Sequence, residues 1–310
     1  MTVGQGVFLG TSDFAATVLR RLAGSEHCPE LVVTLPDRKR GRGRKLQSSP
    51  VADAAEELGI EVVKSANVNA DEDRERILAV GGEWASICAF GQIIKEPLLS
   101  ELPMLNVHPS LLPRWRGAAP IERAVMAGDQ ETGVCVMKLV AGLDSGPVAQ
   151  RRSVPIETEE NYEQLSGRLA ELGGEMLVEA LELSGEGGIE WVEQTDEGLT
   201  YAGKIESSER RIDPGMAVCP VNDLIRAFTP HIGAFIELEG GERLGVRKAS
   251  PAGEGLFADL AAGSFTEQEG RLFFGCCDGA LELQTVQPAG GKPMDAGDYL
   301  RGRGLPAAST

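Results

Sequence analysis

The chain has 310 residues, of which 42% are hydrophobic, and a formal net charge of −17 at pH 7. This composition supports a packed core and excludes a generally disordered chain. No apolar run approaches the roughly 20 residues of a membrane-spanning helix, and the N-terminus lacks the pattern of a secretory signal, so we expect a cytoplasmic protein. The acidity taken alone argues against a nucleic-acid partner.

The first 185 residues alternate between strand-like and helix-like segments. Short apolar runs predict strands at residues 6–10, 30–35, 61–64, 85–90, 104–108 and 132–140. Amphipathic runs with capping residues predict helices at residues 12–24, 48–59, 73–80, 120–128 and 161–183. This alternation indicates an α/β domain with a mostly parallel sheet that is covered by helices.

The pattern changes after residue 183. The stretch 184–209 is glycine-rich and acidic, which is typical of a connector. Beyond it, short apolar runs at 234–239, 243–249, 255–260, 271–276 and 280–286 are separated by turn residues, a pattern that predicts a small β-barrel or sandwich. We therefore expect a catalytic domain over 1–188, a linker over 189–206 and a C-terminal domain over 207–310.

The glycines near the N-terminus do not form a dinucleotide-binding loop. Such a loop follows the first strand and opens the next helix, whereas Gly4 and Gly6 precede the strand and only Gly10 follows it. The sequence also has no G-x-x-x-x-G-K-[ST] motif, and its six cysteines include no C-x-x-C pair. We expect neither a NAD or ATP site nor a metal.

Three polar residues at predicted strand ends carry the chemistry that we expect. Asn106 and His108 end the strand at 104–108, and their spacing of two places both side chains on one face. Asp144 stands on a glycine-flanked loop after the strand that ends at residue 140. An amide and an imidazolium can donate hydrogen bonds to an oxygen that gains negative charge, and a nearby carboxylate favours the imidazolium. Because no Ser or Cys is clearly placed as a nucleophile, direct attack by a substrate amine on a bound acyl carbon fits best.

The segment after His108, HPSLLPRWRGAAP, contains three prolines that hold the loop rigid. A lone histidine is more often a buried residue that the backbone satisfies, but a rigid loop beside Asn106 favours a catalytic one. Arg114 and Arg116 either contact phosphates or fix the loop by hydrogen bonds, and we favour the second interpretation. Trp115 is expected to pack rather than to stack on a substrate.

Residues 37–45, DRKRGRGRK, hold six basic residues and one acidic residue in an otherwise acidic chain. A solvated loop is the common explanation of such a segment. Here it follows the strand that ends near Leu35, on the sheet edge that we expect to carry Asn106 and His108. That position favours a role in binding.

Several of these segments resemble the folate-dependent formyltransferase family. The Asn-x-His strand end, SLLPRWRGAAP and the LDSG loop carry the resemblance, and FLGTSDFA, AFGQII, YAGKIESSERRID and LQTVQPAGGKPM extend it over nearly the whole chain. The central motif is shared with members that formylate glycinamide ribonucleotide or amino sugars. The basic segment and the C-terminal domain make the chain most similar to the members that act on methionyl-initiator tRNA.

The resemblance implies a Rossmann-like catalytic domain, an oligonucleotide-binding-type (OB-like) C-terminal barrel and a role in translation initiation, and we expect a monomer. The implied co-substrates are 10-formyltetrahydrofolate and the α-amino group of methionyl-initiator tRNA, with Asn106, His108 and Asp144 as catalytic residues and no metal. The implied folate-site residues are Phe90, Gly91, Gln92, Ser110, Leu111, Leu112 and Pro113. The implied tRNA contacts are Arg38, Lys39, Arg40, Arg42, Arg44 and Lys45.

Three alternatives stay open at this point. A hydrolase that releases formate from formyltetrahydrofolate would have no use for the basic segment, and a sugar-amine formyltransferase should bind a nucleotide. An inactive RNA-binding module would keep the basic segment without the chemistry. The C-terminal domain is itself acidic, and RAFTPHIGAFIELEG lacks the tryptophans typical of this stretch in relatives, so either its basic residues cluster on one side or the domain contributes little to tRNA affinity.

Overall fold

The computed structural model describes residues 6–40, 45–185, 188–253, 255–257 and 259–307. The chain divides into two compact units. Unit 1 holds the chain up to Pro120 together with Glu131–Pro155 and Ser166–Ala202, and unit 2 holds Ile121–Gln130, Ile156–Leu165 and the chain from Gly203 onward. No helix among the described residues has the length and apolar character needed to cross a membrane.

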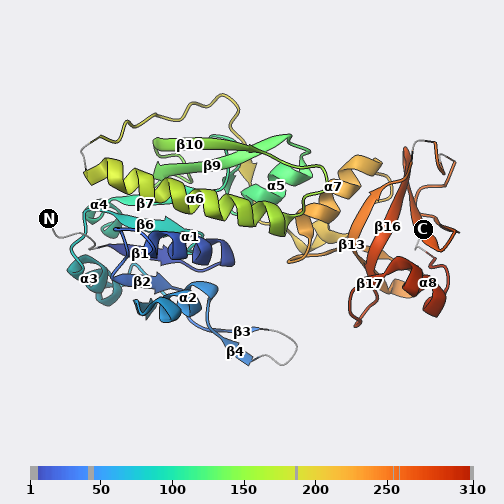
Figure 1. Ribbon diagram of the computed structural model, residues 1–310, viewed down its shortest axis with the longest axis horizontal. Coiled ribbons are helices and arrows are strands. Elements are labelled where there is room, and N and C mark those ends of the chain that lie inside the picture. The colour runs from blue at the N-terminus through green and yellow to red at the C-terminus, as the bar shows by residue number, and fades with distance from the viewer. Residues whose placement is uncertain (1–5, 41–44, 186–187, 254, 258, 308–310) are drawn as a thin grey trace. The chain divides into compact units, whose positions relative to one another are not determined.

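A seven-stranded sheet forms the centre of unit 1 (Figure 1), in the order β10-β9-β7-β6-β1-β2-β5. The five strands from β7 to β5 run parallel, β9 is antiparallel to β7, and β10 is antiparallel to β9. The prediction of a mostly parallel sheet is confirmed, while β10 has no counterpart among the predicted strands. The strands are β1 (Val7–Gly10), β2 (Leu31–Thr34), β5 (Glu61–Lys64), β6 (Ala85–Cys88), β7 (Met104–His108), β9 (Glu131–Lys138) and β10 (Val148–Pro155).

Helices α1 and α2 of unit 1 begin and end where the sequence supplies caps. Ser12 accepts a hydrogen bond from the Ala15 amide, and Ser49 accepts one from the Ala52 amide, so two of the predicted N-caps are present. Gly59 ends the second helix in the left-handed conformation, with φ 72°. The helices are α1 (Asp13–Ala23), α2 (Pro50–Leu58), α3 (Asp71–Ala79), α4 (Leu98–Glu101) and α6 (Tyr162–Gly185), of which the part from Ser166 belongs to unit 1.

Helix α6 packs closely on the sheet because of a pair of glycines. A Cβ on Gly173 would lie 2.7 Å from Val107 Cγ1 of β7, and one on Gly174 would lie 2.6 Å from Arg21 Cβ of α1. Real Cβ atoms do not approach so closely, so glycine at these two positions lets α6 contact both the sheet and α1. Figure 1 shows α1 and α6 crossing the same face of the strands.

Two small sheets complete unit 1. The hairpin of β3 (Arg38–Arg40) and β4 (Lys45–Gln47) lies within the basic segment. β8 (Arg116–Gly117) pairs in parallel with β11 (Tyr201–Ala202), a strand from the far end of the stretch predicted as a connector.

Unit 2 contains an antiparallel sheet in the order β12-β13-β16-β15-β14, with β17 paired to β16. The predicted C-terminal β domain is confirmed and its sheet is antiparallel, with β12 and β14 at the two ends of the strand order among the described residues, in place of a closed barrel. The strands are β12 (Ala234–Glu237), β13 (Arg243–Pro251), β14 (Phe265–Gln268), β15 (Arg271–Cys276), β16 (Gly279–Gln287) and β17 (Met294–Asp295). The helices are α5 (Pro120–Met126), α7 (Val218–Phe228), α8 (Ala296–Arg303) and two 3₁₀ turns, η1 (Ser207–Arg210) and η2 (Glu239–Gly241).

Two features of unit 2 differ from the sequence prediction. Residues 255–257, expected to begin a strand, form a turn, and Phe257 has a φ of 59°, which no strand allows. Its ring packs 4.6 Å from that of Phe273, which explains the apolar run without a strand. Helix α7 was not predicted, although Val221, Leu224 and Phe228 follow helical spacing and are buried.

Candidate active site

Strand β7 positions the first two site residues. Val107 faces Gly173 of α6, so its neighbours Asn106 and His108 project to the opposite face of the sheet. Asn106 is 9% exposed and His108 is 4% exposed. The structure therefore places an amide and an imidazole side by side on one face, as their spacing predicts.

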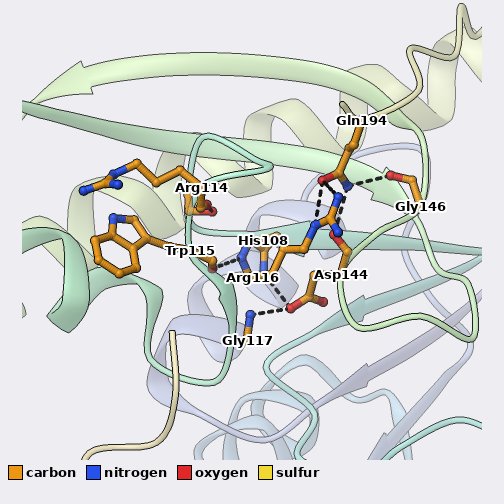
Figure 2. A network of polar contacts seen from close by, with 9 residues as sticks. His108, Arg114, Trp115, Arg116, Gly117, Asp144, Gly146 and Gln194 are labelled. Atoms are coloured by element: carbon orange, nitrogen blue, oxygen red, sulfur yellow. Dashed lines mark hydrogen bonds and ion pairs between the residues drawn. The ribbon is translucent and has the colours of Figure 1, made fainter. Parts of the chain in front are cut away.

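The His108 ring lies between two oxygen atoms (Figure 2). Nε2 is 3.0 Å from the carbonyl oxygen of Trp115, which accepts its hydrogen. Nδ1 is 3.7 Å from Asp144 Oδ2, which is beyond hydrogen-bond length. Nδ1 therefore points toward a carboxylate but makes no hydrogen bond to it. When both ring nitrogens are protonated, Nδ1 can donate a hydrogen bond to a bound molecule.

Asp144 reaches His108 by a route that the sequence argument did not foresee. The sequence places Asp144 after a strand end, as it does Asn106 and His108, but β9 is antiparallel to β7 and its last residue, Lys138, lies beside Leu105. The loop between β9 and β10 carries Asp144 back to the imidazole. The Gly117 amide donates to Asp144 Oδ2 at 2.8 Å and so orients the carboxylate.

The Asn106 amide is the unused polar group of the site. Within the described part of the chain its side chain makes no hydrogen bond, and its polar atoms are not among the fully buried atoms that lack a partner, so they remain accessible although the residue is 9% exposed. Most buried side-chain amides are satisfied by the protein. An unspent amide two residues from His108 is therefore available to an oxygen of a bound substrate.

The loop from His108 to Gly117 is tied down at several points. Ser110 Oγ donates to the Arg114 carbonyl at 2.7 Å, and Arg151 donates to the Leu112 carbonyl. Arg116 is 8% exposed and donates two hydrogen bonds to Gln194 Oε1, at 3.0 and 2.8 Å. The interpretation of Arg116 as a residue that fixes the loop is confirmed, while Arg114 stacks on the Trp115 ring at 4.3 Å.

The residues expected to line a folate site differ in what their side chains can offer. Phe90 and Leu112 belong to hydrophobic core clusters, and Ser110 is fully buried. Gln92 accepts from the Val68 amide and donates to the Ser65 carbonyl, both at 2.9 Å. Gly91 is exposed, and Leu111 and Pro113 are partly exposed.

The basic hairpin begins at the carboxyl edge of the parallel strands, the edge at which His108 ends β7. Arg38, Lys39 and Lys45 are exposed, and Arg40 ends β3. Arg42 and Arg44 lie outside the described residues. At the base of the hairpin, Lys64 Nζ pairs with Asp37 at 2.7 Å, and this hydrogen bond raises the pKa of the Lys64 ammonium.

Sequence reasoning did not identify two residues that contact the site, Gln194 and Thr200. Gln194 Nε2 donates to the carbonyls of Asp144 and Gly146, at 2.9 and 2.7 Å (Figure 2). Thr200 Oγ1 accepts from the Trp115 amide at 2.9 Å. Both lie in the glycine-rich, acidic stretch, and no local pattern there distinguishes them from connector residues.

Family models match the chain in both of its parts. A formyl transferase model matches residues 5–181, and a model of the formyl transferase C-terminal domain matches residues 204–304. The first match contains Asn106, His108 and Asp144. The stretch that contains Gln194 and Thr200 lies between the two matches.

Curated relatives extend the similarity to nearly the full length. The chain is 41% identical over 304 residues to a methionyl-tRNA formyltransferase of Methylobacterium nodulans, covering 96% of each chain. It is 40% identical over 310 residues to that of Sinorhizobium medicae, covering 98% of this chain and 97% of the relative. A third, from Paracoccus denitrificans, is 41% identical over 309 residues, covering 97% of this chain and 98% of the relative.

Solved structures share the fold at lower identity. WlaRD, described as a sugar 3N-formyl transferase, matches 91% of this chain and 98% of its own with a TM-score of 0.66 and 16% identity. HypX from Aquifex aeolicus in complex with tetrahydrofolic acid matches 95% of this chain and 46% of its own with a TM-score of 0.64 and 17% identity. With family models over both parts and relatives near 40% identity over almost every residue, this chain belongs to the formyltransferase family.

Proposed function

We propose that this enzyme transfers the formyl group of 10-formyltetrahydrofolate to the α-amino group of methionyl-initiator tRNA. Curated relatives at about 40% identity over nearly the whole chain carry the name methionyl-tRNA formyltransferase. Solved structures of the same fold were obtained with tetrahydrofolic acid and with 5-N-formyl-tetrahydrofolate. The single structural observation that supports the chemistry best is the unspent Asn106 amide beside the His108–Asp144 pair.

The acyl transfer needs hydrogen-bond donors for one oxygen. When the amine nitrogen attacks the formyl carbon, a C–N bond forms and the formyl oxygen gains negative charge. Asn106 and the His108 Nδ1–H supply two donors on one face of β7. A preorganised donor of this kind contributes roughly 3 kcal/mol to the stability of the transition state.

The tetrahedral adduct then loses its bond to N10 of the folate. A proton must leave the attacking nitrogen, and N10 must gain one as the bond breaks. The Gly117 amide donates to Asp144 Oδ2, and within the described residues the second oxygen, Oδ1, accepts no hydrogen bond. This oxygen is free to pass the proton, directly or through water, and such transfers contribute about 10²–10⁴-fold to a rate.

The acceptor amine needs little activation by the protein. A free α-amino group has a pKa of about 7.7–8.0, and the neighbouring ester of an aminoacyl-tRNA lowers it further. A large share of the amine is therefore neutral at pH 7. The site needs to orient it and to stabilise the oxyanion rather than to supply a strong base.

The basic hairpin supplies the contact to tRNA. Arg38, Lys39 and Lys45 are exposed at the sheet edge at which His108 ends β7, and Arg40, Arg42 and Arg44 complete the run. Phosphate contacts of this kind position a nucleic acid without reading its sequence. The C-terminal antiparallel sheet supplies a second surface, and the enzyme acts as a cytoplasmic monomer.

The test is a comparison of acceptors with one labelled formyl donor. The purified chain is mixed with 10-[¹⁴C]formyltetrahydrofolate and with methionyl-initiator tRNA, methionyl-elongator tRNA, free methionine, or a dTDP-linked amino sugar. We expect label in the aminoacyl ester of the initiator tRNA at a rate at least a hundredfold above that with any other acceptor. Label in the amino sugar, or release of formate to water at the same rate without an acceptor, would refute the proposal in favour of the corresponding alternative.

A further inference from the structure

Residues 192–202, which we term the strap, contact both sides of the His108 site. At its start, Val192 and Val148 exchange two backbone hydrogen bonds, of 2.8 and 2.9 Å, beside the loop of Asp144. At its end, β11 pairs with β8 and the Ala202 carbonyl accepts from the Ala118 amide at 2.8 Å. The strap belongs to unit 1 throughout, so these contacts lie within one compact unit.

Each of the two oxygens that face the His108 ring belongs to a residue with an unusual backbone. Trp115 has a φ of 65° and Asp144 has a φ of 43°. Residues other than glycine adopt this left-handed conformation at a cost, and the surrounding structure must hold them there. The ring position in Figure 2 therefore depends on whatever fixes these two residues.

Side chains of the strap make hydrogen bonds to the backbone of both Asp144 and Trp115. Gln194 Nε2 donates to the Asp144 carbonyl at 2.9 Å and to the Gly146 carbonyl at 2.7 Å. Thr200 Oγ1 accepts from the Trp115 amide at 2.9 Å. One side chain thus holds the residue that carries the carboxylate, and the other holds the residue that carries the carbonyl.

Both polar atoms of the Gln194 amide make hydrogen bonds to the loops around His108. Both of its donor hydrogens go to the Asp144 loop, and its oxygen accepts twice from Arg116, which is itself buried in the loop after His108. The amide therefore links the two loops that flank the imidazole. Replacement by glutamate would keep the acceptor for Arg116 and remove both donors.

We propose that Gln194 and Thr200 are positioning residues, through which the strap holds Asp144 and Trp115 at the distances from the His108 ring that formyl transfer requires. Neither residue needs to touch substrate. The kinetic test of this inference rests on the proposed function. The spectroscopic test does not, because the environment of the His108 ring can be measured without turnover.

The kinetic test uses Gln194→Glu, Gln194→Ala and the pair Thr200→Val and Thr200→Ser. We expect Gln194→Glu and Gln194→Ala to lower kcat by about 10–100-fold, the size of loss that a misplacement near 1 Å causes, with the KM values of both substrates changed less than about threefold. Thr200→Val should lose kcat in the same way, and Thr200→Ser, which keeps the hydroxyl, should restore it. Gln130→Ala is the matched control, since among the described residues the one hydrogen bond of that amide is a local contact with the Gly128 carbonyl.

The second readout is the imidazole ¹⁵N spectrum at one fixed pH. The chain has three histidines, so the His108 signals can be assigned by substitution. We expect the Gln194 and Thr200→Val variants to shift the His108 nitrogens toward their values in Asp144→Asn, and to leave those of His27 and His231 in place.

The outcomes separate the two proposals. Unchanged His108 signals together with unchanged kcat in Gln194→Glu, or a rise in KM alone, would overturn the positioning role. If the Gln194 variants fail to fold, the contrast between Thr200→Val and Thr200→Ser decides it. If the wild-type chain formylates no tRNA, the proposed function fails, while the His108 spectra still test the strap.

Discussion

At the scale of single residues, two asparagine side chains differ in their hydrogen bonds: Asn69 is bonded to the protein, whereas Asn106 is available to a substrate. Asn69 spends its side chain on the Ile93 carbonyl and on the Lys95 amide, at 2.9 and 2.7 Å. Asn106 is more deeply buried, yet within the described residues its side chain has no such partner. The polar atoms of Asn106 are not among the fully buried atoms that lack a partner, so this amide can take its partner from a bound substrate.

We expect Asn106→Ala to lower kcat by about 10²–10³-fold, because it removes a donor to the oxyanion, without lowering the free energy of unfolding. The matched variant Asn69→Ala removes the side-chain hydrogen bonds to Asn67, Ile93 and Lys95 and should lower the free energy of unfolding by roughly 1–3 kcal/mol with kcat nearly unchanged. Steady-state kinetics and urea unfolding of the two variants check this. The idea fails if both variants lose stability alike and neither loses turnover.

At the scale of elements, helix α6 sets the position of β7 from behind. Gly173 lets the helix contact Val107, the residue between Asn106 and His108 on the opposite face. Asn106, Val107 and His108 are consecutive residues of the five-residue strand β7. A displacement of Val107 would therefore move both site residues. The tight packing behind the strand therefore contributes to the geometry of the site in front of it.

Gly173→Ala should destabilise the chain by about 1–3 kcal/mol, the usual cost of an overpacked core, and should also lower kcat. Gly167→Ala lies in the same helix with nothing within 4 Å of the new methyl group. It should stabilise the chain by about 0.5–1 kcal/mol, since alanine replaces glycine in a helix. Thermal unfolding and kinetics of the pair measure both effects, and equal stability of the two variants would show that α6 does not press on β7.

A second element-scale contact joins α5 to η1 within unit 2. Arg123 donates to Glu209 at 3.0 Å, and this hydrogen bond lowers the pKa of the Glu209 carboxyl below its usual 4.5. A lowered pKa in the folded state means that the contact stabilises the fold above pH 4.5 and is lost as the pH falls through the lowered value.

Glu209→Gln should therefore cost roughly 0.5–1 kcal/mol at pH 7, as expected of an ion pair near the surface. The difference from the wild type should shrink steadily below about pH 4.5. Chemical unfolding of both proteins between pH 7 and pH 4, at low protein concentration, measures this difference in the free energy of unfolding. A difference that is constant over this range, or that grows as the pH falls, would contradict the assignment.

At the scale of the whole molecule, the charge is strongly negative while one hairpin is strongly positive. A net charge of −17 repels tRNA at long range, whereas the six basic residues of 37–45 attract it locally. The repulsion favours binding in the one orientation that brings the hairpin to the nucleic acid. Affinity for tRNA should then fall steeply with added salt, because phosphate contacts release counterions.

Replacing Arg42 and Arg44 together by Ala should raise the KM for tRNA by about tenfold or more and reduce its salt dependence, with the KM for the formyl donor unchanged. Arg20 and Arg76 provide the matched control, since each is already paired with a glutamate, Glu57 and Glu61, at 2.8 and 3.0 Å. Kinetics at 50 and 200 mM salt test the prediction. A loss as large in the control pair would indicate a general charge effect and no specific role for the hairpin.

The sequence by itself determined six of the seven strands of the central sheet and the shared face of Asn106 and His108. Apolar runs such as VFLG and LVVT form buried parallel strands, and Ser12, Ser49 and Gly59 begin or end helices, because these preferences act over a few neighbouring residues. Asn106 and His108 share a face because strand periodicity is local. Only the tertiary structure decided how Asp144 reaches His108, since the direction of β9 depends on its pairing with β7. The roles of Gln194 and Thr200 were also decided there: hydrogen bonds between residues 50 to 85 positions apart leave no periodic trace in the sequence.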